Sequence, residues 1–202
     1  PVQFIFAGKS HPADLHGKMI IHNLYKFSKE LENRPKFIFI EDYDIHIAKF
    51  LVQGVDVWLN NPVRPQEASG TSGMKAGMNG VINFSVLDGW WDEAYEKDMG
   101  WQIGNGVEFE NMQDGIKVES SQIYDTLEKE IIPMFYERND QGLPEKWIKM
   151  MKQSVIKVGS VYNTHRMVSD YYQKYYLQAQ LSYGHLSLNN YAEVKRISPA
   201  KK

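Results

Sequence analysis

Residues 55–86 read VDVWLNNPVRPQEASGTSGMKAGMNGVINFSV, and this stretch decides the fold. It begins with an apolar run at 55–59 and ends with a second one at 81–86, each of strand length. Between them, the small residues at 67–73 predict a loop that leads into a helix carrying Lys75. A strand, a helix and a second strand in this order are typical of parallel strands joined by a crossover helix.

The same alternation precedes this stretch. Two further apolar runs, at 2–7 and 37–40, read as buried strands. Asp14 predicts the start of a helix between them, and a shorter helix is predicted to end at Gly54. We therefore predict an α/β fold, a Rossmann-like parallel sheet with helices on both faces. In such sheets ligands bind beyond the carboxyl ends of the strands, so Glu41, 60–75 and 88–91 are predicted to share one cleft.

The second half is predicted to be a helical C-terminal segment. The predicted division is 1–120 as the Rossmann-like cofactor- and sugar-binding part, 121–187 as helices packing on it, and 188–202 as a polar tail. Within these parts, 105–122 are predicted to form a loop or an irregular strand. Apolar stripes at helical spacing, including a tyrosine stripe, are predicted to face a core. They are Ile123, Leu127, Ile131 and Phe135; Trp147, Met150, Met151, Val155 and Val158; and Tyr171, Tyr172, Tyr175 and Tyr176.

Composition excludes several classes of protein. The 202 residues carry a formal net charge of −2 without a strong basic cluster, which argues against nucleic acid or anionic lipid as a partner. The absence of cysteine excludes a disulfide scaffold and thiolate metal sites, and it is compatible with a cytoplasmic location. No apolar run reaches the length of a membrane span. The six histidines are scattered, so we predict no metal site.

Residues 67–75 have the chemistry of an anion site. A helix N-terminus offers free backbone N–H groups and the positive end of the helix dipole, and glycines let a ligand approach closely. Three interpretations follow from the residues. A plain helix start would use Ser69 or Thr71 as N-cap. A Walker-type loop fails, because Met74 separates Gly73 from Lys75. A lysine beside a phosphate cradle, as pyridoxal 5′-phosphate requires, is the third.

Several segments together resemble the C-terminal part of an α-glucan phosphorylase, which acts on glycogen, starch or maltodextrin. They are 6–9, 39–43, 54–60, 67–75 and 87–93, the last containing Trp90-Trp91, a pair that either lines or plugs the cleft. The resemblance runs over roughly residues 2–106 and is closer to the short bacterial and archaeal type than to the animal enzymes. It implies the C-terminal domain of a GT-B glycosyltransferase fold.

The resemblance also implies residue roles. The lysine at the position of Lys75 forms the Schiff base with pyridoxal 5′-phosphate and is the catalytic residue of this chain. The cofactor-binding positions are Lys75, Gly70, Thr71, Ser72 and Tyr43, and the substrate-binding positions are Glu67, Ser69 and Gly70. Members of this family transfer a terminal α-1,4-linked glucosyl unit from the glucan to inorganic phosphate, which gives glucose 1-phosphate. A buried carboxylate and a helix N-terminus suit the sugar and the phosphate dianion, respectively.

The sequence departs from the family pattern in several respects, one of which is Ser72-Gly73 in place of a Gly-Asn pair in the animal enzymes. Asp44 stands where the animal enzymes carry an arginine near the cofactor. The upstream Lys-Arg phosphate clamp and the N-terminal domain have no counterpart in these residues. We therefore expect a fragment that is inactive alone and holds the cofactor weakly or not at all. Two alternatives stay open: a nucleotide-sugar-dependent GT-B glycosyltransferase similar to glycogen or starch synthase, and a non-catalytic carbohydrate-binding domain. A homo-oligomer also stays open.

Overall fold

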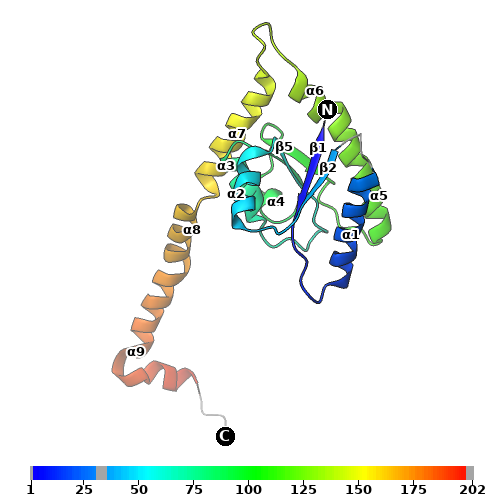
Figure 1. The fold of residues 1–202 in the computed structure, drawn as a ribbon. Helices are drawn as coiled ribbons and strands as arrows, with labels where there is room; N and C mark the ends of the chain where they lie inside the picture. Colours follow the sequence, from blue (N-terminus) through cyan, green and yellow to red (C-terminus); the bar gives the residue numbers. More distant parts are fainter. Residues whose placement is uncertain (1, 31–35, 199–202) are drawn as a thin grey trace. The chain divides into compact units, whose positions relative to one another are not determined.

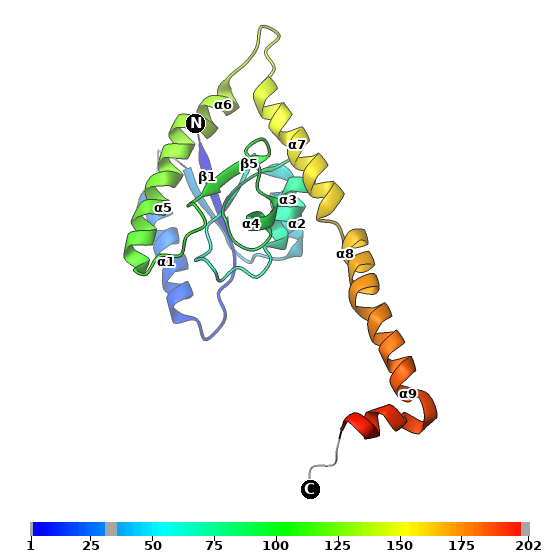
Figure 2. The same cartoon turned by 180° about the vertical axis from the view of Figure 1, so that it is seen from behind.

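The computed structural model describes residues 2–30 and 36–198, and it divides the chain into two compact units (Figures 1 and 2). The first unit is Pro1–Gly54 and the second is Val55–Lys202. Each unit has its own parallel sheet. The predicted α/β class, with parallel sheets flanked by helices and a helical C-terminal segment, is confirmed.

The first unit is a strand–helix–strand motif followed by one more helix. Its elements are β1 (Gln3–Ala7), α1 (Leu15–Glu30), β2 (Lys36–Ile40) and α2 (Ile45–Gly54). The two strands pair in parallel from Gln3 opposite Lys36 to Ala7 opposite Ile40. Phe37 stacks on Phe4 at 5.0 Å between ring centroids and meets Phe27 of α1 edge-on at 5.3 Å. These aromatic contacts fix α1 against one face of the strand pair.

The second unit contains a three-stranded parallel sheet in the order β3-β4-β5. Its strands and short helices alternate as β3 (Val57–Asn60), α3 (Thr71–Met78), β4 (Ile82–Val86), α4 (Trp90–Ala94) and β5 (Gly100–Ile103). Every residue of the central strand β4 is buried. The carboxyl ends of β3 and β4 lie together, since Asn60 pairs with Ser85. The loops that lead to α3 and α4 therefore start from the same edge of the sheet.

Helices after β5 complete the core of the second unit. They are α5 (Met112–Thr126), the π-helical turn η1 (Leu127–Ile131), α6 (Ile132–Tyr136) and α7 (Glu145–Val161). The stripe predicted at Ile123, Leu127, Ile131 and Phe135 packs on the sheet residues, which confirms that expectation. Trp147 and Met150 belong to the same cluster, and Val158 belongs to a second one around Trp91. Val155, by contrast, is exposed.

The prediction of a loop or irregular strand at 105–122 is confirmed for 105–111 and wrong for 112–122, because α5 begins at Met112. The side chain of Asn111 accepts a hydrogen bond from the backbone N–H of Gln113 at 2.9 Å, so Asn111 is the N-cap. Only Gly115 and Thr126 of α5 are buried, and a helix with so little buried surface shows a weak apolar stripe. The Asn111 cap could have predicted the start of α5, whereas the spacing of its apolar residues could not.

The C-terminal segment consists of α8 (Thr164–Tyr171), the π-helical turn η2 (Tyr172–Tyr176) and α9 (Leu177–Ile197). Figures 1 and 2 show this segment running away from the sheet of the second unit. The expectation that its tyrosines face a core is wrong: Tyr171, Tyr172, Tyr175 and Tyr176 are 46% to 64% exposed. Helical spacing predicts that the four tyrosines share one face of the helix, but it does not predict whether another element covers that face.

The predicted polar tail at 188–202 overlaps the end of α9. Four residues there, Leu188–Tyr191, have non-helical backbone angles, and helical geometry resumes up to Ile197. Residues 199–202 lie outside the described part of the chain. Among the described residues, no helix combines the length and the apolar character that crossing a bilayer requires.

Candidate functional site

The start of α3 is formed by a glycine rather than by a hydroxyl cap. Gly70 is the N-cap residue, with φ 85° and ψ 44°, and no side chain caps the helix. The interpretation that Ser69 or Thr71 is the N-cap is therefore wrong. A β-carbon at Gly70 would lie 3.0 Å from Cδ1 of Trp90, so both the left-handed backbone and the close indole favour glycine here. The hydroxyls of Ser69 and Thr71 remain available for a ligand.

The loop before α3 is fastened to the loop before α4. The carboxylate of Asp88 accepts hydrogen bonds from the backbone N–H groups of Glu67 and Gly89, both at 2.9 Å. The backbone N–H of Trp90 donates to the carbonyl of Ser69 at 2.8 Å. A β-carbon at Gly89 would lie 2.7 Å from that same carbonyl oxygen, so the two loops meet at backbone contact. The positions of Glu67 and Ser69 are thus set by residues of the neighbouring strand's loop.

Arg64 adds a second connection between these loops. Its guanidinium donates to the carbonyl of Leu87 and forms an ion pair with Asp92 at 3.0 Å. The hydrogen bond to Asp92 raises the pKa of Arg64, so the guanidinium stays charged. Sequence reasoning missed Arg64, Asp88 and Asp92 as supports of the loop. Their place beyond adjacent strand ends was the signal that could have found them.

A cavity of about 680 Å³ lies between α3, α4 and the start of α8. The residues from α3 share one face of that helix, since they are spaced at three and four positions. Lys75 is among them and is exposed. The lining residues are Ala68 and Ser69 before α3, Thr71, Met74, Lys75 and Met78 of α3, Gly89, Trp90 and Glu93 at and in α4, and Tyr162, Asn163, Thr164, Arg166, Met167 and Tyr171.

The charged groups of the cavity differ in their availability. Arg166 is held by Asp170 at 2.9 Å and donates to the carbonyl of Val161. Among the described residues, the amine of Lys75 has no hydrogen-bond or ion-pair partner. Burial raises the pKa of the Tyr162 hydroxyl, and the Glu93 carboxylate raises it further, so this hydroxyl stays protonated and can donate. Lys75 is therefore the cavity-lining cation that has no partner among the described residues.

The structure brings together only part of the predicted site. Ser69, Thr71 and Lys75 line the cavity, and Gly70 forms the turn behind it. Glu67 and Ser72 are half-buried and are not among the lining residues. Of the two tryptophans predicted to line or plug the cleft, one lines the cavity and the other does not. Trp90 is 4% exposed and lines the cavity, whereas Trp91 is fully buried in the core.

Tyr43 lies in the first unit, in the turn between β2 and α2. Its predicted place beside a cofactor therefore stays a prediction, as does the predicted contribution of Glu41 to the cleft. Among the described residues, no three His, Asp or Glu side chains are grouped so that they could hold a metal ion.

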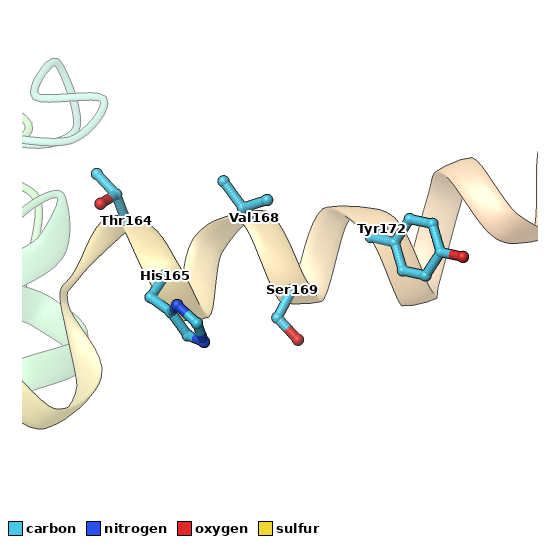
Figure 3. Close-up of a pocket in the computed structure, with 5 residues that line it drawn as sticks. All are labelled: Thr164, His165, Val168, Ser169 and Tyr172. Atoms are coloured by element: carbon cyan, nitrogen blue, oxygen red, sulfur yellow. The ribbon is translucent and has the colours of Figure 1, made fainter.

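A second hollow lies along α8 and the start of η2 and is lined by Thr164, His165, Val168, Ser169 and Tyr172 (Figure 3). Figure 3 shows these side chains spread along a single helix. A binding site ordinarily gathers polar groups from several elements into a concave space. We therefore assign no function to this hollow.

Comparison with known proteins shows the family to which the chain belongs. The profile of the carbohydrate phosphorylases matches residues 1–179. The chain belongs to the carbohydrate phosphorylase family. This assignment confirms the resemblance seen in the sequence and favours it over the nucleotide-sugar glycosyltransferase alternative.

Individual phosphorylases share nearly half of their aligned residues with this chain. It is 49% identical to the glycogen phosphorylase of Aquifex aeolicus over 87% of its length. It is 47% identical to the maltodextrin phosphorylase of Thermococcus litoralis over 89% of its length, and 44% identical to the glycogen phosphorylase of Mycobacterium tuberculosis over 91%. The chain spans only 25%, 21% and 21% of the length of these three phosphorylases, respectively.

Proposed function

We propose that this chain forms the cofactor-binding part of an α-glucan phosphorylase. The complete enzyme would transfer a terminal α-1,4-linked glucosyl unit to inorganic phosphate and give glucose 1-phosphate. The observation that carries the proposal is that the unpaired amine of Lys75 and the N-terminal turn of α3 open on the same cavity. The names of the related glycogen and maltodextrin phosphorylases support the choice of a glucan as substrate.

The residues present fit pyridoxal 5′-phosphate. The Lys75 amine is free to bond with an aldehyde carbon. The first turn of α3 carries backbone N–H groups at 71–72 together with the Thr71 hydroxyl, which suits a phosphate dianion. Trp90 and Met74 give the cavity an apolar wall for a pyridine ring. Lys75, Gly70, Thr71 and Ser72 are therefore the proposed cofactor-binding residues of this unit.

Each residue then has a defined task. When bound, pyridoxal 5′-phosphate supplies a phosphate group that relays a proton or charge to the substrate phosphate. Lys75 holds the cofactor covalently, and the N–H groups of α3 fix its phosphate. The Glu67 carboxylate is proposed to accept hydrogen bonds from hydroxyls of the glucosyl unit, and the Ser69 hydroxyl is proposed to donate one to them. The ties from Asp88 and Trp90 keep the backbone of these two residues in place.

Reductive trapping tests the proposal. The chain is mixed with excess pyridoxal 5′-phosphate, reduced with borohydride and digested, and the modified lysines are identified by mass spectrometry. We expect the adduct at Lys75, its loss in Lys75→Arg, and its retention in Lys152→Arg, which changes an exposed lysine of α7 outside the cavity. Equal labelling of Lys75 and of other exposed lysines would show that the cavity does not select the cofactor.

Inorganic phosphate gives a second measurement on the same site. Because the first turn of α3 is proposed to hold the cofactor's phosphate, added phosphate should slow the labelling of Lys75 by pyridoxal 5′-phosphate. It should not slow labelling by pyridoxal, which lacks that group. Equal effects on the two aldehydes would remove the phosphate cradle from the proposal. The cytoplasmic location and the homo-oligomer stay predictions.

A further inference from the structure

Asn83 is a polar residue in the middle of the buried strand β4. It is 1% exposed, and its side-chain Nδ2 donates to the carbonyl oxygen of Gly73 at 3.0 Å. Gly73 lies in the first turn of α3, two residues before Lys75. A side chain of the sheet thus holds the backbone of the helix that carries the cavity-lining lysine.

The helix approaches its neighbours so closely that two of its residues must lack a β-carbon. A β-carbon at Gly73 would lie 2.7 Å from Oδ1 of Asn83 and 2.9 Å from Nε1 of Trp90. One at Gly77 would lie 2.9 Å from Cγ2 of Val158 on α7. The first turn of α3 therefore lies close against both Asn83 and Trp90.

Stability of the strand does not explain an asparagine here. Within the part of the chain that the structure describes, Oδ1 of Asn83 has no hydrogen-bond partner. A buried amide with only half of its hydrogen bonds lowers stability relative to an apolar side chain of similar size. What the amide contributes is the orientation of α3, because its one hydrogen bond fixes the Gly73 carbonyl in the first turn of that helix.

We propose that Asn83 is a positioning residue for Lys75 and for the phosphate-binding turn of α3, an inference that rests on the proposed function. The helix has only eight residues, so one anchored carbonyl in its first turn sets the rotation of the whole helix. That rotation decides whether Thr71 and Lys75 both face the cavity. Asn83 itself is not among the residues that line the cavity.

The variant Asn83→Asp tests this role, because aspartate has the shape of asparagine but donates only when it is protonated. We would measure hydrogen exchange of peptides covering 70–78 in the full chain, as protection factors relative to the native protein. Asn83→Asp should lose about tenfold protection at about pH 8 and regain native values at about pH 5, where the buried carboxyl is protonated. Asn83→Ala lacks the donor and should lose protection at both pH values.

Val158→Ala is the matched control. It loosens the contact of α3 with α7 at Gly77 but leaves the Asn83 bond in place, so any loss of protection should not depend on pH. If Asn83→Asp keeps native protection at both pH values, or loses it equally at both, the hydrogen bond does not position α3 and the inference is overturned. If Asn83→Asp does not fold, Asn83→Ala decides instead, and native-like protection of 70–78 in that variant would overturn the inference.

The absorbance of the bound cofactor supplies a readout that a merely structural role would not move. The ratio of the pyridoxal 5′-phosphate dissociation constants of Asn83→Asp and native chain should be about ten at pH 8 and about one at pH 5. A ratio that does not change with pH would overturn the inference. If the native chain forms no adduct at Lys75, the proposed cofactor site fails in this chain taken alone, but hydrogen exchange still decides whether Asn83 holds α3.

Discussion

The carboxylate of Asp88 accepts the backbone N–H of Glu67 at 2.9 Å, although the two residues lie 21 positions apart in the sequence. The same carboxylate accepts the N–H of Gly89, also at 2.9 Å, and Asp88 is only 7% exposed. One buried side chain therefore joins the loop that leads to α3 and the loop that leads to α4. The cavity depends on this junction, since both helices line it.

Replacing Asp88 by alanine should lower the free energy of unfolding by about 2–4 kcal/mol, because two N–H groups lose a charged acceptor in a buried place. Asp92→Ala is the matched control: it removes the half-exposed partner of Arg64 and should cost at most about 1 kcal/mol. Urea unfolding of both variants measures the difference. Equal losses would mean that the Asp88 bonds contribute no more than an exposed ion pair.

A methyl group at Gly73 should destabilise the second unit. The added β-carbon would meet Asn83 Oδ1 at 2.7 Å and Trp90 Nε1 at 2.9 Å, and strain of this kind costs about 1–3 kcal/mol. Gly159→Ala is the control with the opposite sign. It lies inside α7 with no atom within 4 Å of its added carbon, so alanine should stabilise by about 0.5–1 kcal/mol. Thermal unfolding of the two variants should therefore shift in opposite directions, and a stabilising Gly73→Ala would show that the turn has room.

The strands and helices up to β4 could be predicted because each is a strong local signal. Apolar runs gave β1, β2 and β4, and Gly54 marked the end of α2. The elements that were missed are those whose signals are short or polar. β5 is Gly-Trp-Gln-Ile, with only two apolar residues, and it exists because Gly100 lets it lie against Asn83 and Trp91. The last turn of α5 is predicted from the stripe that starts at Ile123, but the first part of the helix buries so little that its clearest signal is the Asn111 cap.

The candidate site divides in the same way. Lys75, Ser69 and Thr71 could be predicted because they are contiguous with a helix start. Asp88 and Asn83 are distant in sequence from the loop and helix that their side chains hold, and they bond to backbone atoms, so these hydrogen bonds leave no mark in the sequence around 67–75. The α8 residues line the cavity because of where α8 begins in space, and the spacing of residues within the sequence could not predict this.

Burial of Glu119 on α5 makes one pH effect predictable. Burial raises its pKa above the ordinary value of 4.5, so the folded chain binds this proton more tightly than the unfolded chain does. The resulting contribution to stability is complete below the ordinary value and is lost as pH rises through the raised pKa. Glu119→Gln mimics the neutral form, so it should be more stable than the native chain at about pH 7 and equal to it below about pH 4. Urea midpoints at the two pH values check this, and an advantage that persists in acid would assign it to packing instead.

Phosphorolysis of maltodextrin by the 202-residue chain alone should be slower by at least about a hundredfold than by one of the long related phosphorylases. Among the described residues, the cations that line the cavity are Lys75 and Arg166. The proposed cofactor engages Lys75, and Asp170 neutralises Arg166 at 2.9 Å, so neither is left to hold the substrate phosphate as charge develops on it. Formation of glucose 1-phosphate in a coupled assay measures the rate. Asp170→Ala frees Arg166 and is the informative variant: if it raises turnover to that of a long relative, one free cation in the cavity is enough for turnover.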